Sequence, residues 1–298
     1  MRSKDAFSSL HPVVNFLFFA LVLLFSMFLL HPASLLLSLV CAASYNIYLN
    51  GRRSARKQLR LLLPMALFAA VLNPAFNHQG ATILTYLPSG NPLTLESVLY
   101  GFAAAGMLLC VVLWFSCYTA VMTSDKFVYL FGRVIPALSL LLSMTLRFVP
   151  KFRAQLRTVT EAQKGAGRSA ENGTPVQRIR NAVTILSVLL TWALENAIET
   201  ADSMKSRGYG LPGRSAFSVY RFDRRDRTVL SWLGTVGGSL IFGWVFGAPD
   251  FSYYPLVRGA AVSPISVGFQ LLYLALCLTP LILDFREDAV WKHLRSAI

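Results

Sequence analysis

Two arginines stand out in this sequence because each is placed where a predicted helix ends. Each is flanked by small residues, Arg207 by Ser206 and Gly208, and Arg168 by Gly167 and Ser169. A guanidinium fork that its neighbours leave unobstructed is suited to binding carboxylate or carbonyl oxygens of a partner. An arginine in a last helical turn also interacts with the helix dipole and the free carbonyls, by about 0.3–1 kcal/mol. Arg207 could therefore be a helix cap or a contact point, and the similar ending at Arg168 favours a contact point.

Other residue patterns offer no catalytic chemistry. Gly165, Gly167 and Gly173 follow a predicted helix rather than a strand, and no GK[ST] sequence occurs, which argues against a phosphate-binding loop. The four histidines are scattered without metal-ligand spacing. The cysteines lie in apolar runs without a CxxC pair, so we expect buried, inert thiols at Cys41, Cys110, Cys117 and Cys277. We expect no catalytic residue, metal site or cofactor.

The composition is that of an integral membrane protein. The chain has 298 residues, 55% of them hydrophobic and only 14% charged, against about 25% charged in a typical soluble domain. Several apolar runs reach the roughly 20 residues needed to cross a bilayer. The sequence therefore predicts an all-α membrane protein. The net charge of +14 is interpreted through its position in the chain, and we expect no nucleic-acid partner.

Apolar runs and charge together predict about six crossings of the plasma membrane. The basic segments 50–60 and 124–228 should be cytoplasmic loops, whereas the uncharged segment 77–95 should be external, and both termini cytoplasmic. No small-residue cleavage site precedes the first apolar run, so we expect no cleaved signal. The predicted spans are Val13–Leu30, Ala33–Leu49, Leu61–Phe76, Ser97–Met122, Val229–Gly247 and Ile265–Leu283.

This pattern divides the chain into three parts. Residues 1–123 and 229–298 should hold the membrane helices, and residues 124–228 a helical cytoplasmic region with 17 Lys or Arg against 8 Asp or Glu. Two long helices are predicted there. The first covers Val134–Lys164, with Pro136 and Pro150 as kinks.

The second long helix has clear signals at both ends. Thr174 can cap it, Pro175 suits the first helical position, and Gly208 can adopt the left-handed conformation that stops it. The 33 residues 175–207 would span about 50 Å at 1.5 Å per residue. Apolar and small residues recur every three or four positions along one face, which protein, the membrane surface or both should cover: Ile179, Val183, Leu186, Leu190, Ala193, Ala197, Ala201 and Met204.

Several motifs resemble one membrane-protein family, the T component of energy-coupling factor (ECF) transporters, to which the T subunit of cobalt importers belongs. The resemblance covers most of the chain and is most specific at residues 195–210. The motifs that carry it are "LRFVPKF" (146–152), "EAQKGAG" (161–167) and "RIRNAVTILSVLLTWALENAIETADSMKSRGYG" (178–210).

The resemblance implies a coupling subunit without catalysis of its own. In the family, arginines at the ends of two coupling helices dock in two cytosolic ABC ATPases. The apolar helix faces, here Leu186, Leu190, Ala193 and Ala197, cradle a small substrate-binding membrane subunit that takes up a vitamin or metal ion. Arg207 matches the second arginine position directly. The first position is occupied by Ala166, so either Arg168 acts from a shifted turn or the first dock is altered.

Two other classes of protein are less compatible with the sequence. A stand-alone secondary carrier would need polar or ionisable residues near the bilayer midplane and often an inverted repeat. A membrane enzyme acting on lipid would need a catalytic cluster. Neither pattern is found in the sequence, which also does not identify the transported substrate.

Overall fold

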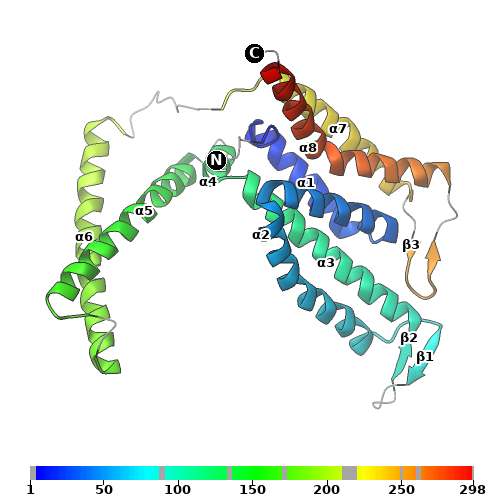
Figure 1. Cartoon of the computed structure of the whole chain (residues 1–298), viewed down its shortest axis with the longest axis horizontal. Helices are drawn as coiled ribbons and strands as arrows, with labels where there is room; N and C mark the ends of the chain where they lie inside the picture. The colour runs from blue at the N-terminus through cyan, green and yellow to red at the C-terminus, as the bar shows by residue number, and fades with distance from the viewer. Residues whose placement is uncertain are drawn as a thin grey trace. The chain divides into compact units, whose positions relative to one another are not determined.

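The computed structural model of the chain describes residues 5–86, 91–132, 136–169, 173–209, 220–248, 251–259 and 263–296. Within these residues it contains eight helices and two short hairpins (Figure 1). The helices are α1 (Pro12–Phe28), α2 (Pro32–Phe76), α3 (Leu95–Val121), α4 (Ser124–Gly132), α5 (Pro136–Gly165), α6 (Pro175–Ser206), α7 (Arg224–Val245) and α8 (Pro264–Ser296). The antiparallel hairpins pair β1 (Ile83–Tyr86) with β2 (Pro92–Thr94), and β3 (Phe251–Ser252) with β4 (Arg258–Gly259). The predicted all-α class is confirmed.

The chain divides into two compact units. The first comprises residues 1–123 and 220–298 and holds α1–α3, α7, α8 and both hairpins; the second comprises residues 124–219 and holds α4–α6. Among the described residues, α2, α3, α6, α7 and α8 are long and apolar enough to cross a membrane, and α1 is a shorter apolar helix. The predicted multi-pass membrane protein is therefore supported, while the number of crossings and the side of each loop stay predictions.

The basic segment 50–60 is helical, so the predicted loop there is wrong. α2 continues through the segment and is interrupted only at Gly51, whose φ of 79° and ψ of 155° are not helical. The Asn46 Nδ2 atom donates to Gln58 Oε1 at 3.0 Å, although twelve residues of straight helix would separate the two by about 18 Å. The predicted spans Ala33–Leu49 and Leu61–Phe76 are thus the two arms of one bent helix. Arginine and lysine are good helix formers, and one glycine with positive φ suffices for the bend.

The core of the first unit is held together by a buried chain of hydrogen bonds across four helices. Trp114 Nε1 of α3 donates to Ser38 Oγ of α2 at 3.0 Å. The Ser38 hydroxyl is hydrogen-bonded to the Ser26 hydroxyl of α1, with 3.1 Å between the two oxygens. The Ser26 hydroxyl is in turn hydrogen-bonded to the Tyr273 hydroxyl of α8, with 3.2 Å between the oxygens. Hydroxyl and indole groups of this kind join helices that have no hydrophobic driving force between them in lipid. The four cysteines are buried and free, as predicted.

Two buried carboxylates fix the turn that precedes α1. Asp284 Oδ1 of α8 accepts the Phe7 N–H, and Asp226 Oδ1 of α7 accepts the His11 N–H, both at 2.9 Å. The Phe7 side chain, which these bonds position, is completely buried in the core. In the sequence Asp284 stands only at the edge of a predicted span, and nothing near it indicates its burial.

The sequence Leu-His-Pro occurs twice, and each copy begins a helix. The His11 Nδ1 atom accepts the Val13 N–H at 3.3 Å at the start of α1, and His31 Nδ1 accepts the Ala33 N–H at 3.2 Å at the start of α2. Both rings must be unprotonated at Nδ1 to accept these bonds. Burial lowers the pKa of both histidines; for His11 the nearby Asp226 carboxylate opposes this effect in part.

We expect these two caps to make stability fall in mild acid. Because both pKa values are lower in the folded chain than the unfolded value of about 6.5, the unfolded chain binds more protons below that pH, and the stabilisation present above it is lost as the pH falls. The double variant His11→Asn, His31→Asn keeps a capping acceptor without the titration. Thermal unfolding in detergent should therefore depend less on pH in the variant than in the wild type, between about pH 7.5 and about pH 5.5. Equal pH dependence in both proteins would contradict this role.

In the residues of the second unit that the structure describes there are three helices, α4, α5 and α6. α5 begins at Pro136, so this proline starts the helix instead of kinking it; Pro150 lies inside the helix, and Val134 lies outside the described residues. α4 was not predicted. α6 ends one residue before the predicted 175–207. A small core of Val159 from α5 with Ile185 and Leu189 from α6 packs the two long helices together.

Candidate functional site

The start of α6 is defined by a complete capping box. The Thr174 hydroxyl accepts the Gln177 N–H at 3.4 Å, and Gln177 Oε1 accepts the Thr174 N–H at 3.2 Å. Pro175 occupies the first helical position, where its missing N–H costs nothing. The predicted start of this helix is therefore confirmed.

The end of α6 is closed by the backbone alone. Gly208 has a φ of 77°, its N–H bonds the Lys205 carbonyl at 3.0 Å, and the Tyr209 N–H bonds the Met204 carbonyl at 3.1 Å. This pair of bonds is the Schellman motif, which satisfies carbonyls that the helix would otherwise leave open. The stop at Gly208 is as predicted.

The Arg207 side chain takes no part in this closure. Arg207 occupies the C-cap position with a φ of −86° and a ψ of 9°, and its own N–H bonds Lys205 and Met204 carbonyls. Its side chain is exposed and makes no hydrogen bond or ion pair within the described part of the chain. The guanidinium is thus available to a partner, whereas the capping that the sequence analysis considered is done by main-chain N–H groups.

α5 ends in the same way. Gly167 has a φ of 74°, its N–H bonds the Lys164 carbonyl at 3.1 Å, and the Arg168 N–H bonds the Gln163 carbonyl at 2.8 Å. Aligning the two motifs on their glycines places Ala166 at the position of Arg207, and Arg168 at the position of Tyr209. The two helix ends therefore share their backbone geometry but present their arginines two residues apart in register.

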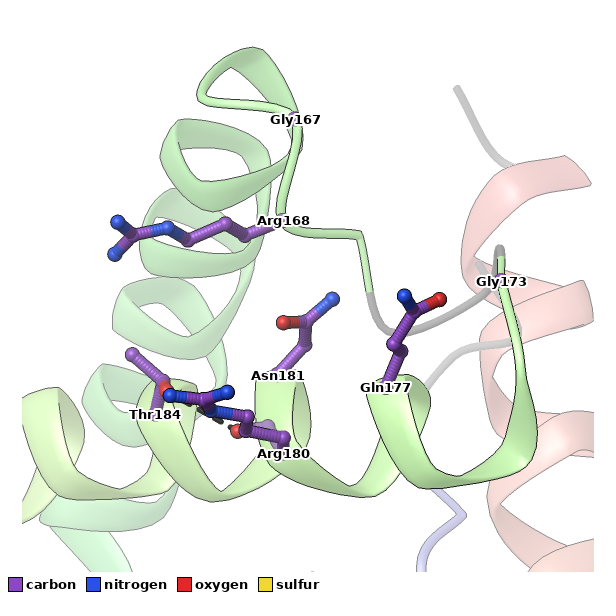
Figure 2. A pocket seen from close by; sticks show the side chains of 7 residues that line it. All are labelled: Gly167, Arg168, Gly173, Gln177, Arg180, Asn181 and Thr184. Carbon is purple, nitrogen blue, oxygen red and sulfur yellow. Dashed lines mark hydrogen bonds between the residues drawn. The ribbon is translucent and has the colours of Figure 1, made fainter.

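A hollow of about 630 Å³ lies beside the end of α5 and the start of α6. Figure 2 shows Arg168 and Arg180 directing their guanidinium groups toward the same side of this hollow. Asn181 Nδ2 donates to the Ser169 carbonyl at 2.9 Å and so ties the segment after α5 to α6. The residues that line the hollow are Gly167, Arg168, Gly173, Gln177, Arg180, Asn181 and Thr184.

The predicted apolar face of α6 is largely uncovered within the second unit. Leu186 and Leu190 are each 56% exposed, Ala197 is exposed and Ala193 is half-buried. A neighbouring face, with Ile185 and Leu189, packs on α5 instead. Leu186 and Leu190 also border a largely apolar hollow of about 230 Å³ between the two helices, lined by Phe152, Arg153, Leu156, Leu186, Leu189 and Leu190. Exposed leucines beside an apolar hollow are suited to a hydrophobic partner.

All of the predicted site residues lie in the second unit. The ends of α5 and α6 that carry the arginines, and the apolar face of α6, occupy different parts of this unit. Arg207 lies at one end of α6 and the Arg168 hollow near the other, while Leu186 and Leu190 lie between them. Sequence reasoning missed Arg180, which lines the hollow together with Arg168. Its position twelve residues after Arg168 has no local signal, because the two arginines meet only where the start of α6 lies beside the end of α5.

The fold and the site describe a multi-pass, all-α membrane protein with a separate basic helical unit. Comparison with known families agrees: residues 4–218 match the CbiQ family, described as cobalt transport protein. This chain belongs to the CbiQ cobalt transport protein family.

Several relatives carry the name energy-coupling factor transporter transmembrane protein EcfT. Those of Leuconostoc gelidum and Bacillus selenitireducens are 29% identical over 112 residues and 33% identical over 95 residues. These matches cover 37% and 32% of this chain, and 41% and 35% of the two relatives. An uncharacterized protein of Mycoplasma genitalium, MG181, is 24% identical over 163 residues, which are 51% of this chain and 37% of that protein. The chain thus matches about two fifths of these relatives' length, and the resemblance to ECF T components is confirmed.

Proposed function

We propose that this chain is the transmembrane coupling subunit of an ECF-type importer. It transmits the ATP-driven motion of two cytosolic ABC ATPases to a small substrate-binding membrane subunit, for uptake of a vitamin or a metal ion. The observation that carries the proposal is the repeated helix end of the second unit. Each end is closed by backbone bonds around a glycine, and an exposed arginine is left beside it.

The ATPases dock at these two ends. At the end of α6 the docking group is Arg207, whose guanidinium is not used by the helix itself. Ser206 and Gly208 leave it unobstructed, so that it can bind carboxylate or carbonyl groups of an ATPase in a bidentate manner. The second unit and both chain termini then lie in the cytoplasm, in agreement with the basic charge of residues 124–228.

The substrate-binding subunit packs on the apolar face of α6. Leu186 and Leu190 supply exposed apolar area, and Ala193 and Ala197 allow a partner helix to approach closely. Because α5 and α6 share one core, a displacement of their ends by the ATPases would move this face as well. The chain itself would perform no catalysis, since ATP hydrolysis takes place in the ATPases.

Purification from native membranes tests the assembly. The tagged wild-type chain should bring down two ATPase polypeptides with Walker motifs and one small membrane protein, identified by mass spectrometry, and the double variant Arg168→Glu, Arg207→Glu should lose the ATPases. Transport by the chain alone in liposomes, without ATP, would instead support a stand-alone secondary carrier.

The shifted register at the end of α5 gives a separate prediction. Arg168→Ala should weaken ATPase binding by about tenfold to a hundredfold, because a hydrogen bond to a charged group contributes roughly 1.5–3 kcal/mol. Adding Ala166→Arg to that variant places a guanidinium at the C-cap position that Arg207 occupies in α6, and should restore the affinity. Binding of the purified ATPases to the reconstituted chain measures both effects. If neither substitution changes the affinity, the end of α5 is not a docking site.

A further inference from the structure

The β1–β2 hairpin carries apolar side chains that nothing in the described part of the chain covers. All four residues of β1 are exposed, and Ile83, Leu84 and Tyr86 are 50%, 55% and 65% exposed. The pairing of β1 with β2 shifts register between Ile83 and Thr85, so simple alternation does not assign Ile83 and Leu84 to opposite faces of the hairpin. A two-stranded hairpin has little stability of its own in water, so a surface that covers these apolar side chains would stabilise it.

The base of the hairpin is fixed firmly to α3. Glu96 is 1% exposed, its Oε1 atom accepts the Thr82 hydroxyl at 2.8 Å, and the Leu95 N–H donates to the Thr82 carbonyl at 3.0 Å. Thr94 is fully buried, and its hydroxyl donates to the Gln79 carbonyl at 2.8 Å. These hydrogen bonds therefore hold the hairpin in a defined orientation at the start of α3. They also fix the position of its exposed residues.

The hairpin connects two apolar helices that also expose large side chains. Phe76, the last residue of α2, is 79% exposed, and Phe102 in α3 is 64% exposed. Both belong to helices that are long and apolar enough to span a bilayer, so lipid is the covering that we expect for these two side chains. Residues 77–95 contain no Asp, Glu, Lys or Arg, and entering the membrane interface therefore needs no desolvation of a charged side chain.

We propose that the β1–β2 hairpin is a membrane-interface anchor, inserted among the lipids of the leaflet opposite the basic segments. Ile83 and Leu84 lie at the boundary between headgroups and acyl chains. Tyr86 places its apolar ring there and its hydroxyl among the headgroups, as tyrosines do in interfacial belts. Since Ile83, Leu84 and Tyr86 are all exposed, the hairpin enters the interface with these three side chains in contact with lipid.

Spin labels distinguish lipid from water at these positions. The native cysteines are buried among the described residues, so single variants Ile83→Cys and Leu84→Cys can be labelled selectively in the full chain reconstituted alone in phosphatidylcholine–phosphatidylglycerol liposomes. Collisions with oxygen, which concentrates in the bilayer, should exceed collisions with a water-soluble nickel chelate several-fold at both positions. Val71→Cys, on an exposed position of α2, is the lipid reference, and Arg53→Cys, in the exposed basic segment, is the water reference.

The same measurement can overturn the proposal. Labels at both positions that collide with the nickel chelate as often as the label at position 53 would show that the hairpin stands in water. The exposed apolar residues of the hairpin would then be covered by a protein partner, which is absent from these liposomes. A label in lipid at one position and in water at the other would contradict insertion of both residues.

Discussion

Replacing Arg207 with glutamate is expected to abolish stable binding of the ATPase at the end of α6. The exposed guanidinium makes no hydrogen bond or ion pair within the described residues. The substitution therefore breaks no such contact in the chain and changes only the charge and the hydrogen-bonding groups that a partner would contact. Truncating one partner of a buried, hydrogen-bonded charge pair costs about 2–5 kcal/mol, and reversing the charge adds repulsion. We therefore expect the dissociation constant to rise at least about thirtyfold.

Binding of purified ATPase to the reconstituted chain checks this result. Arg157→Glu is the matched control, because Arg157 is also an exposed arginine, on α5, away from both helix ends. Arg207→Lys should retain part of the affinity, since it keeps the charge without the planar fork. If Arg207→Glu binds the ATPase as tightly as Arg157→Glu does, the docking role of Arg207 is wrong.

Placing carboxylates on the open face of α6 is expected to separate the substrate-binding subunit from the complex. Leu186 and Leu190 are more than half exposed and border a hollow whose lining is apolar except for Arg153. Two carboxylates buried there by a partner lose their hydration, and the single charge of Arg153 can compensate only one of them. The double variant Leu186→Glu, Leu190→Glu should therefore lose coupled uptake and the small membrane subunit together, while the ATPases stay bound.

Co-purification and ATP-dependent uptake measure the two effects of this variant. Val188→Glu is the control, because two residues turn a helix by about 200° and place Val188 on the opposite side from Leu190 and Leu186. Val188 is itself 40% exposed, so a charge is tolerated there in the isolated chain. An equal loss of the small subunit with Val188→Glu would mean that the predicted face is not the specific interface.

The features that the sequence predicted well are those with local signals. The start and end of α6 are set by Thr174, Pro175 and Gly208, each of which acts within a few residues of its own position. The helical spacing placed Leu186 and Leu190 on one face of this helix, and the structure leaves both more than half exposed. The all-α class followed from the apolar runs, which need no knowledge of tertiary contacts.

The features that the sequence missed depend on distant partners or on a single backbone conformation. Asp284 meets Phe7 across 277 positions of sequence, and Asp226 meets His11 across 215, so neither burial has a local pattern. The dense run of basic residues after Gly51 predicts a loop there, whereas the structure has a bend within a helix. At the end of α5, the sequence left the role of Arg168 open. The backbone then showed that Ala166, not Arg168, is the structural counterpart of Arg207.

Photo-crosslinking in the assembled complex tests the central claim most directly. Ser203→Cys, at an exposed position one turn before Arg207, and Leu190→Cys can each carry a cysteine-reactive photo-crosslinker, because the native cysteines are buried. The coupling role predicts that position 203 crosslinks to a cytosolic ATPase and position 190 to the small membrane subunit within one complex. Crosslinks from position 203 to lipid or to the small membrane subunit, with none to an ATPase, would contradict it.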